Sequence, residues 1–336
     1  MIKRTATFDI IKKVGSAMTK RRLGKNLEVS SIGFGIMGMD HAYGAPKDRK
    51  EMIKLIHQAF DLGCYFFDTA PVYGVANEIL LGQAIKGHPD AVIATKFGII
   101  GMTAVNGLIK QEFNSSPESI RRQVEDSLRR LEVESIDLYY QHRIDPAVEP
   151  EIVADTMGQL IKEGKIKHWG TSNAPIDYVR RAHAITPITA MENQYSMVYR
   201  SPEKDVFPLC EELGIGFVAY SPLGNGFLSG RYSAETVFED GDFRNTMGRF
   251  KAEVIAKNQV LLDFLKDFAG QKHLTPAQLV LAWELGQKNY IVPIPGTTKS
   301  YRLKENLATM SVQLTDAEMA EINQALDTFE IDETHF

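Results

Sequence analysis

The sequence alternates between short apolar runs and longer amphipathic stretches from about residue 31 to about residue 308. The apolar runs are typical of buried strands, and the stretches between them have the spacing of helices. Eight runs follow one another in this way, at residues 31–35, 64–67, 91–95, 136–140, 166–170, 189–192, 216–220 and 290–293. Repeated strand–helix alternation predicts a parallel sheet, and eight strands close such a sheet into a barrel. We therefore predict an α/β fold, a (β/α)8 TIM barrel, with a doubly wound open sheet as the alternative.

Terminal signals support the predicted helices. Ser116 precedes Pro117 where a helix would start, and Thr315 with Glu318 forms a capping-box pattern. The expected helices cover residues 48–62, 76–86, 117–131, 149–163, 175–185, 202–213, 253–287 (as two helices), 299–308 and 315–328. The last of these are extra C-terminal helices beyond the barrel. Residues 21–30 predict an N-terminal β-hairpin with its turn at residues 24–26.

The composition is that of an ordinary globular protein. Of the 336 residues, 44% are hydrophobic and 24% are charged, and the net charge of −5 disfavours nucleic acid as a partner. No apolar run reaches the length of a membrane span. Because nothing marks a linker, we predict a single domain over residues 20–336, with residues 1–19 as an N-terminal extension. Residues 99–116 and about 224–252 are expected to be long, functional loops.

Two further features concern the compartment and metals. The N-terminus lacks the apolar core of a signal peptide. Cys64 and Cys210 lie far apart without CxxC spacing, which is typical of small buried residues in a reducing compartment. We predict a cytoplasmic protein without a metal site.

A glycine pattern at residues 33–38 matches G-x-G-x-x-G, the pattern of a dinucleotide-binding turn. That turn requires a helix to open at its last glycine, whereas residues 39–46 are typical of a loop. We therefore reject this assignment and expect the glycines to let the first strand end tightly beneath a ligand.

Four residues at the ends of neighbouring strands suit proton transfer to a carbonyl oxygen. Asp68, Lys96 and His142 end the second, third and fourth runs, and Tyr73 follows in the loop after Asp68. A tyrosine of ordinary pKa, near 10, is a poor acid at neutral pH. We expect the ammonium of Lys96 to lower the pKa of Tyr73, with Asp68 holding Lys96 in place. His142 would then donate a hydrogen bond to the substrate oxygen.

Later strand ends predict a nucleotide lying across the rim of the barrel. Ser172, Asn173 and Gln194 offer donors and acceptors that suit a carboxamide, and Tyr220 offers a flat ring for stacking. Residues 295–302 enter a helix with hydroxyl groups and two cations, a combination typical of a phosphate site. Each feature alone is also compatible with helix capping or packing.

Taken in order, the strand-end motifs resemble those of the aldo-keto reductases from about residue 21 to about residue 330. The motifs are Asp68-Thr69-Ala70 with Tyr73-Gly74, Ala94-Thr95-Lys96, Tyr140-Gln141-His142, Gly170-Thr171-Ser172-Asn173, Asn193-Gln194-Tyr195, Tyr220-Ser221-Pro222-Leu223, and Ile294-Pro295-Gly296 with Glu305-Asn306. The first loop is most similar to the bacterial and plant branch. The resemblance implies a barrel that binds NADP(H) and transfers hydride to an aldehyde or ketone.

The resemblance also implies roles for individual residues. Tyr73 would be the general acid, tuned by Lys96 and Asp68, and His142 would orient the substrate. The implied cofactor-binding residues are Met37, Ser172, Asn173, Gln194, Tyr220, Ser221, Pro222, Leu223, Gly224, Gly226, Arg231, Gly296, Thr298, Lys299, Arg302, Glu305 and Asn306. Lys299 and Arg302 favour NADP over NAD, since a 2′-phosphate is bound by cations.

The substrate is a small carbonyl compound that the sequence does not name further. The expected pocket residues are Met39, His41, Tyr43, Phe97 and Arg143, with parts of residues 224–252 and the C-terminus. The aromatic side chains suggest aromatic or medium-length aliphatic aldehydes. Arg143 either binds an anionic group of the substrate or pairs with Asp145, which we favour.

Two other functions remain as alternatives. One is a cofactor-sensing module like the potassium-channel β-subunits, which resemble this fold but carry asparagine in place of His142. The presence of His142 therefore favours an enzyme. The other is a phosphosugar isomerase or aldolase barrel, in which Gln194 and Tyr220 would have no role. The oligomeric state is left open.

Overall fold

The strands of the predicted barrel are present in the computed structural model, which describes residues 20–105 and 108–334. Eight parallel strands form one sheet in the order β12-β11-β10-β9-β8-β5-β4-β3. Their bounds are β3 (Phe34–Gly35), β4 (Phe66–Asp68), β5 (Val92–Phe97), β8 (Ile136–Gln141), β9 (Ile166–Ser172), β10 (Ala190–Gln194), β11 (Gly216–Tyr220) and β12 (Ile291–Pro293). The (β/α)8 fold is confirmed. The predicted extension, residues 1–19, lies outside the described residues.

Glycines close the sheet where its first and last strands meet. Gly35 and Gly296 form a parallel bridge, and the Gly33 amide donates to the Pro293 carbonyl over 2.9 Å. A Cβ on Gly35 would lie 2.9 Å from the carbonyl oxygen of Ile294, so a side chain there would push the two backbones apart. The glycine-rich first strand therefore serves this contact between β3 and β12, which we call the seam.

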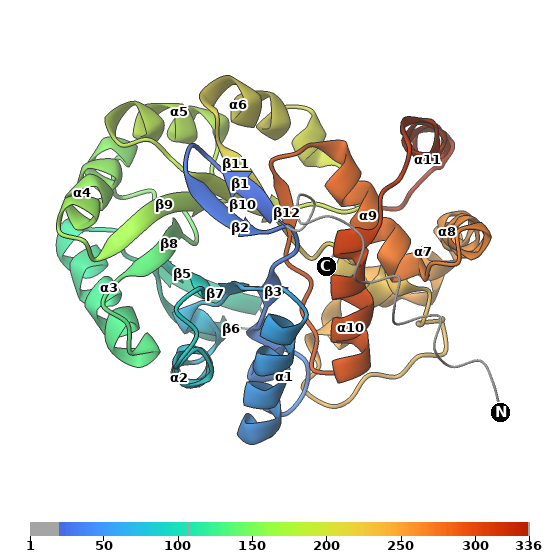
Figure 1. Ribbon diagram of the computed structural model, residues 1–336, viewed down its shortest axis with the longest axis horizontal. Coiled ribbons are helices and arrows are strands. Elements are labelled where there is room, and N and C mark those ends of the chain that lie inside the picture. Colours follow the sequence, from blue (N-terminus) through green and yellow to red (C-terminus); the bar gives the residue numbers. More distant parts are fainter. Residues whose placement is uncertain (1–19, 106–107, 335–336) are drawn as a thin grey trace.

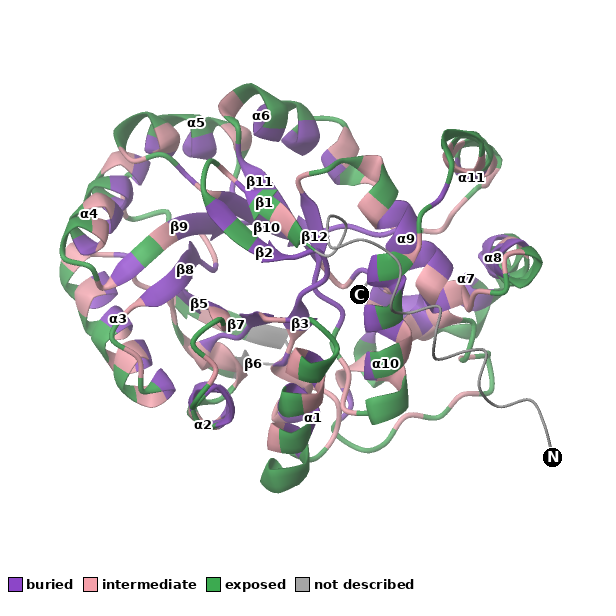
Figure 2. Cartoon of the chain, viewed as in Figure 1, coloured by how far each residue is buried: buried purple, intermediate pink, exposed green. Residues whose placement is uncertain are grey.

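Helices surround the strands (Figure 1). They are α1 (Arg49–Asp61), α2 (Val75–Ala84), α3 (Pro117–Leu131), α4 (Pro150–Lys162), α5 (Ile176–Ile185), α6 (Val206–Leu213), α9 (Pro276–Gln287) and α10 (Ser300–Ala308). Each turns a buried face towards the strands, and all except α9, which is mostly buried, turn an exposed face outwards (Figure 2). The predicted start of α3 is confirmed, since the Ser116 hydroxyl accepts a hydrogen bond from the Ser119 amide. No α-helix opens at Gly38: this residue lies in a single 3-10 turn, η1 (Met37–Met39), and the next α-helix is α1, so the dinucleotide fingerprint is correctly rejected.

Three further helices lie beside α9, outside the ring: α7 (Ala252–Lys257), α8 (Gln259–Gln271) and α11 (Asp316–Thr328). The capping box of α11, made by Thr315 and Glu318, is confirmed. Residues 253–287 hold three helices rather than the two that we expected, because the chain breaks at Asn258 as well as after α8. No helix of the described part is long and apolar enough to cross a membrane.

The first predicted long loop contains a hairpin. β6 (Ile99–Val105) and β7 (Leu108–Phe113) pair antiparallel, with Ile99 opposite Phe113 and Thr103 opposite Lys110. The connection at residues 99–116, predicted only as a long loop, therefore contains two strands. β-Branched and aromatic residues in both arms favour strands, and the two arms satisfy each other's backbone groups without joining the barrel.

The N-terminal hairpin, β1 (Lys20–Leu23) and β2 (Leu27–Ser30), covers one end of the barrel, as Figure 1 shows. Leu23, Leu27 and Val29 are buried and join the cluster of side chains inside the strand ring. A Cβ on Gly216, at the start of β11, would lie 2.5 Å from the Leu23 side chain. The hairpin thus seals the amino-terminal end of the strands, and the predicted hairpin is confirmed.

The alternation of inward and outward side chains along the strands determines which residues lie at the carboxyl-terminal end of the barrel. The interior cluster includes Phe66, Ala94, Leu138, Ala190 and Val218. Because side chains two residues apart share a face, the next inward positions lie one layer closer to the carboxyl ends. These positions are Asp68, Lys96, Tyr140, Glu192 and Tyr220. The barrel interior therefore changes from apolar to polar within one layer.

Candidate active site

A cavity of about 740 Å³ lies at the carboxyl ends of the strands. Most of the predicted site residues line it. They are Met37, His41, Tyr43, Asp68, Tyr73, His142, Arg143, Ser172, Tyr220, Ser221, Pro222, Leu223, Gly226, Arg231, Gly296, Thr298, Lys299, Arg302, Glu305 and Asn306. Residues from nearly every strand end thus meet in one space, as the barrel geometry requires.

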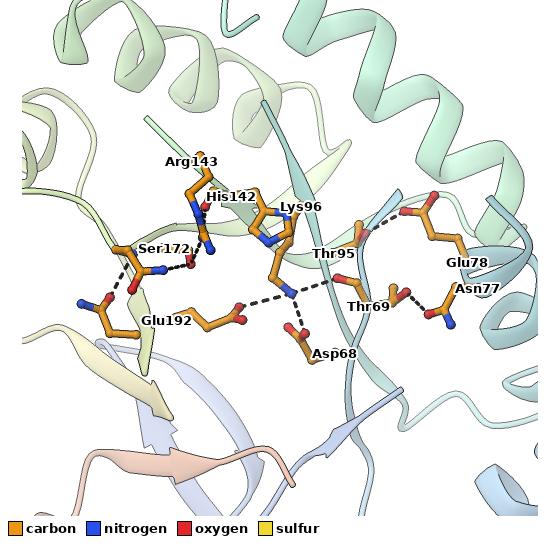
Figure 3. Close-up of polar contacts among 12 residues, drawn as sticks. Asp68, Thr69, Asn77, Glu78, Thr95, Lys96, His142, Arg143, Ser172 and Glu192 are labelled. Carbon is orange, nitrogen blue, oxygen red and sulfur yellow. Dashed lines mark hydrogen bonds and ion pairs between the residues drawn. The ribbon is translucent and has the colours of Figure 1, made fainter. Parts of the chain in front are cut away.

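Lys96 and Asp68 form a buried ion pair in the floor of the cavity. Lys96 Nζ lies 2.5 Å from Asp68 Oδ1 and donates a second hydrogen bond to the Thr69 carbonyl over 3.0 Å (Figure 3). The two side chains are 0% and 3% exposed, so water does not screen their attraction. Burial alone would lower the pKa of Lys96, but the carboxyl groups of Asp68, first, and Glu192 raise it overall. Lys96 therefore stays charged, as predicted.

Helix α2 fixes the two strand ends that carry this pair. The Thr69 hydroxyl donates to Asn77 Oδ1 over 2.7 Å, and the Thr95 hydroxyl donates to Glu78 Oε1 over 2.7 Å (Figure 3). Asn77 and Glu78 are fully buried, and Glu78 is neutralised by an ion pair with Arg130. These bonds hold β4 and β5 at a fixed spacing and hence hold Asp68 against Lys96.

Tyr73 lies above this pair, in the short 3-10 helix η2 (Pro71–Tyr73). The Lys96 ammonium is 5.4 Å from the centre of the Tyr73 ring, and the His142 ring meets it edge-on at 5.9 Å. Burial raises the pKa of Tyr73, and Lys96 opposes this without outweighing it. The prediction of a lowered pKa is therefore wrong in its net direction, although Lys96 acts in the expected sense. Tyr73 remains a phenol at neutral pH, which is the form that can donate a proton.

His142 continues the inward positions of β8. Its backbone amide donates to the Phe97 carbonyl over 2.9 Å, which fixes the chain where the strand ends. Burial, with smaller contributions from Lys96 and Arg143, holds the pKa of His142 well below its usual value. His142 is thus a neutral imidazole that can donate one ring N–H to a ligand oxygen.

A group of polar side chains joins Tyr220 to the end of β9. The Tyr220 hydroxyl donates to Asn173 Oδ1 over 3.4 Å, and Asn173 Nδ2 donates to Ser172 Oγ over 3.1 Å. Arg143 Nη1 also donates to Ser172 Oγ, over 3.2 Å. The structure therefore brings together Ser172, Asn173 and Tyr220, as the sequence predicts.

Gln194 does not join this group. It is 6% exposed and lies outside the cavity lining, whereas Glu192, two residues earlier on β10, lines the cavity. The cavity lining therefore includes β10 at Glu192, and the role expected of Gln194 stays a prediction. Alternation carries the signal for Glu192: Ala190 faces the barrel interior, so Glu192 and then Gln194 are the next inward residues.

Glu192 is thus a site residue that sequence reasoning did not identify. Its Oε2 atom lies 3.4 Å from Lys96 Nζ, on another side of the ammonium from Asp68 (Figure 3). Burial and the nearby Asp68 carboxylate raise the pKa of Glu192 to about 8, and Lys96 opposes this shift.

The far end of the cavity is basic. Lys299 and Arg302 line it at the start of α10, and neither forms an ion pair with any residue that the structure describes. In the 3-10 segment η4 (Gly224–Ser229), Asn225 and Gly226 have φ of 60° and 97°. Within this turn the Gly226 amide donates to the Leu223 carbonyl over 3.0 Å, so the two cations are what favours an anion at this end. Together these features suit a phosphorylated ligand.

An ion pair spans the cavity at this end. Arg231, after η4, lies 2.6 Å from Glu305 of α10, and the Arg231 guanidinium lies 5.5 Å from the ring centre of Tyr301. Both Arg231 and Glu305 were predicted to bind a nucleotide. Their direct contact links the loop after β11 to the helix after β12.

Besides Lys96, Asn173 and Gln194, three predicted residues lie away from the cavity lining. Met39 and Phe97 are 1% and 2% exposed and belong to the hydrophobic core between strands and helices. Phe97 follows the inward Lys96 and so points to the outer face of β5, against Tyr139. Gly224 is buried behind the loop, where its φ is 56°. The expectation that Met39 and Phe97 contact substrate is wrong.

Arg143 is not paired with Asp145. Arg143 Nη1 donates to the His142 carbonyl and to Ser172, whereas Asp145 accepts from the amides of Ser115 and Ala147. The pairing that we favoured is therefore wrong, because Asp145 caps its own loop. The Arg143 guanidinium faces the cavity instead.

The second long loop contributes a cation surrounded by aromatic rings. The Arg244 guanidinium lies 4.2 Å from the ring centre of Phe238, 5.0 Å from Tyr43 and 5.2 Å from Tyr232. Asp242 neutralises it at 2.5 Å. This cluster forms one wall of the cavity, and the sequence indicated it only as part of the expected loop.

The described residues offer no alternative metal or thiol chemistry at the cavity. No group of three or more histidine, cysteine or acidic side chains suited to a metal occurs in that part of the chain. Cys64 and Cys210 are both buried, as expected, and burial raises the pKa of each thiol to about 12.

Comparison with known proteins agrees with this geometry. The Aldo/keto reductase family profile matches residues 31–327. The chain is 44% identical over 305 residues to "Probable aldo-keto reductase 1" of Glycine max, covering 90% of this chain and 87% of the relative. Among solved structures, a glycerol dehydrogenase from Gluconobacter oxydans superposes with a TM-score of 0.85 at 27% identity, covering 94% of this chain and 97% of that one. The holo form of an aldo-keto reductase from Bacillus halodurans gives a TM-score of 0.73 at 26% identity, with 92% and 96% covered. The chain belongs to the aldo/keto reductase family, whose members are oxidoreductases that act on carbonyl and alcohol groups with a nicotinamide cofactor.

Proposed function

We propose that the protein is an NADPH-dependent carbonyl reductase that converts aldehydes and ketones to alcohols by reversible hydride transfer, with Tyr73 as the general acid. One observation carries the proposal: Tyr73 and a neutral His142 face the cavity directly above the buried pair of Lys96 and Asp68. This arrangement brings a proton donor, a hydrogen-bond donor and a fixed positive charge to one point.

Each residue has a distinct task in the reduction. His142 donates a hydrogen bond to the carbonyl oxygen and so orients the substrate. Tyr73 donates its hydroxyl proton to that oxygen as negative charge develops there, a step that is typically worth about 10²–10⁴-fold in rate. Lys96 stabilises the phenolate that Tyr73 leaves behind, and Asp68 keeps Lys96 charged. The reduced nicotinamide supplies the hydride when it is bound.

The residues of the cavity fit a phosphorylated nicotinamide cofactor. Ser172 and Asn173 would hold the carboxamide, and Tyr220 would stack on the ring. Ser221, Leu223, Gly226 and Arg231, which line the cavity, would surround the pyrophosphate. NAD enzymes place an acidic residue near the ribose. Here the start of α10 presents the cations Lys299 and Arg302 instead, which supports NADP(H) over NAD(H).

The wall of the cavity bears on the substrate class. Val72, Ile99, Met102 and Val237 give it apolar surface, which supports aromatic or medium-length aliphatic aldehydes. Because Arg143 donates only to oxygens of neighbouring residues, it is free of any carboxylate partner among the described residues. An anionic group on the substrate would therefore find a cation there.

The replacement Tyr73→Phe tests the mechanism. We expect it to abolish reduction of 4-nitrobenzaldehyde while leaving NADPH binding, measured by fluorescence titration, within about twofold, because only the hydroxyl is removed. Tyr65→Phe is the matched control, since Tyr65 lies outside the cavity lining. Reduction by Tyr73→Phe at the wild-type rate would refute the role of Tyr73.

A substrate screen tests the activity itself. Loss of absorbance with NADPH and NADH should be followed in parallel against a panel of aldehydes and ketones. Faster turnover with NADPH is the expected result. Tight NADPH binding without turnover of any carbonyl would favour the cofactor-sensing alternative. The presence of His142 favours the enzyme.

A further inference from the structure

Glu192 is a second buried carboxyl beside the proposed proton donor, and none of the steps above uses it. It is 3% exposed and projects from β10 into the same space as Asp68 from β4. Glu192 Oε2 receives no hydrogen bond of good geometry from the described residues, and neither does Asp68 Oδ2. A buried carboxylate oxygen without a donor is costly, so this arrangement favours a form of the group that keeps a proton.

The contacts of Lys96 place it between the two carboxyls. Its ammonium approaches Asp68 at 2.5 Å, the Thr69 carbonyl at 3.0 Å and Glu192 at 3.4 Å (Figure 3). The contact with Asp68 is a tight, charge-assisted hydrogen bond, and the contact with Glu192 is looser. Lys96 is therefore held by Asp68 and adjoins Glu192, and the centre of the Tyr73 ring lies 5.4 Å from its ammonium.

The charges around Glu192 come from every side of the cavity floor. The titratable and charged groups that act on it or feel its charge are Asp68 (β4), Tyr73 (η2), Lys96 (β5), Tyr140 (β8), Arg143 (after β8) and Tyr220 (β11). Two carboxyls that share one ammonium are not both ionised easily, because each negative charge disfavours the other. Asp68 has the closer contact with the cation, so Glu192 is the member that retains a proton near neutral pH. Its pKa of about 8 agrees with this assignment.

We propose that Glu192 is the acid that returns a proton to Tyr73, through Lys96, after each reduction. The proposal rests on the proposed function, because it needs Tyr73 to give up its proton. It adds a residue, and a direction of proton flow, to that reaction.

The proton balance of the return is simple. Tyr73 loses the proton of its O–H bond to the new alcohol and becomes a phenolate. One N–H bond of Lys96 breaks as the phenolate takes that proton, and the carboxyl O–H bond of Glu192 breaks as the amine of Lys96 takes the next. Glu192 is left as a carboxylate beside a restored ammonium, and it regains a proton from water once the cavity opens. The two electrons of the reduction come from the reduced nicotinamide, so the return moves protons alone.

The variant Glu192→Gln tests the proposal, because it keeps the shape of the side chain and removes its proton. We expect the wild-type kcat for carbonyl reduction to fall as pH rises through about 8, where Glu192 loses its proton. Glu192→Gln should have a kcat at least about 10-fold lower at pH 7, without that decline between pH 7 and pH 9. Glu192→Asp should restore the decline, whereas KM for the carbonyl and the Kd for NADPH should change little in either variant. A merely structural role would lower kcat at all pH values equally and leave the decline in place.

A second measurement uses the protein without cofactor or substrate. In protein labelled with ¹³C at the glutamate carboxyl carbons, one resonance should titrate near pH 8 and should be missing from Glu192→Gln. Glu284→Gln is the matched control, since Glu284 is also fully buried and its pKa is also raised by burial, but it lies in α9 outside the cavity lining. It should remove a different resonance and leave the pH profile of kcat unchanged.

The outcomes separate this proposal from the proposed function. Turnover by the wild type with an identical pH profile in Glu192→Gln would overturn the proton return and leave the reductase intact. Titration of Glu192 below about pH 6 in the NMR experiment would overturn it as well, because no proton would remain to be returned. Absence of carbonyl reduction by the wild type would instead overturn the reductase, and the proton return with it.

Discussion

Replacing Lys96 by methionine should make the stability of the protein strongly dependent on pH. Methionine is an uncharged side chain of similar length to lysine. The change leaves Asp68 and Glu192 buried without their cation. Removing one partner of a buried ion pair costs about 3–5 kcal/mol in unfolding free energy when the other partner stays charged. The buried carboxyl reduces this cost by taking up a proton.

The pH dependence follows from that proton. The pKa of Asp68 in the folded variant is raised, so the folded state binds a proton that the unfolded state has released, and stability falls as pH rises. One pH unit is worth about 1.4 kcal/mol for one proton, so the loss should grow by up to about 4 kcal/mol between pH 5 and pH 8. Glu192 contributes little to the difference in stability between the variant and the wild type. Its pKa is about 8 in the wild type, so it is already largely protonated between pH 5 and pH 8.

Urea unfolding of the cofactor-free protein at pH 5 and pH 8 measures the effect. We expect Lys96→Met to lose about 1 kcal/mol at pH 5 and about 5 kcal/mol at pH 8. Lys167→Met is the control, since Lys167 pairs with Asp137 but its side chain is 58% exposed. The control should lose less than about 1 kcal/mol at both pH values. Equal losses of unfolding free energy for Lys96→Met at the two pH values would refute the claim that buried charge determines how far this replacement destabilises the protein.

Two further changes test the phosphate end and the sealed end of the barrel. Arg302→Ala should weaken NADPH binding about 10–100-fold and leave NADH binding unchanged, because it removes a charge-assisted contact to the 2′-phosphate; an equal loss for both cofactors in fluorescence titrations would contradict this role. Gly216→Ala should lower the unfolding free energy by about 1–3 kcal/mol, since the new Cβ would lie 2.5 Å from Leu23. Gly270→Ala, where a Cβ has open space, should not destabilise the protein, and thermal unfolding that ranks the two variants in the opposite order would contradict the packing argument.

The barrel could be predicted because its signal is repeated along the chain. Each apolar run pairs with the next, so an error in one run does not change the topology. Asp68, Lys96 and His142 were also predictable, since parallel strands all present their carboxyl ends at one rim. The ion pair between Lys96 and Asp68 was predictable as well, because a buried ammonium requires a partner of opposite charge.

The errors come from which face of the chain a residue occupies. Phe97 was assigned by its nearness to the end of a strand, whereas Ala94 had already fixed the inward face of β5. Gln194 shares the inward face of β10 with Ala190 and Glu192 and pairs with Tyr220, so its face was assigned correctly. Following that alternation would have excluded Phe97 and identified Glu192. The net pKa of Tyr73 depends on burial as well as on Lys96, and burial in the cavity floor follows only from the folded chain.

The seam between β3 and β12 has a consequence for how ligands act on the whole barrel. Strands β3 and β12 have no ladder of paired residues between them and meet through the bridge from Gly35 to Gly296. Residues on both sides of that joint, Met37 and Gly296, line the cavity. A ligand that contacts both sides therefore ties the first strand to the last, where local opening of the ring has the fewest bonds to break. Occupancy should slow amide hydrogen exchange along β3 and β12 more than along the strands opposite, so the cofactor would complete the barrel as well as serve its chemistry.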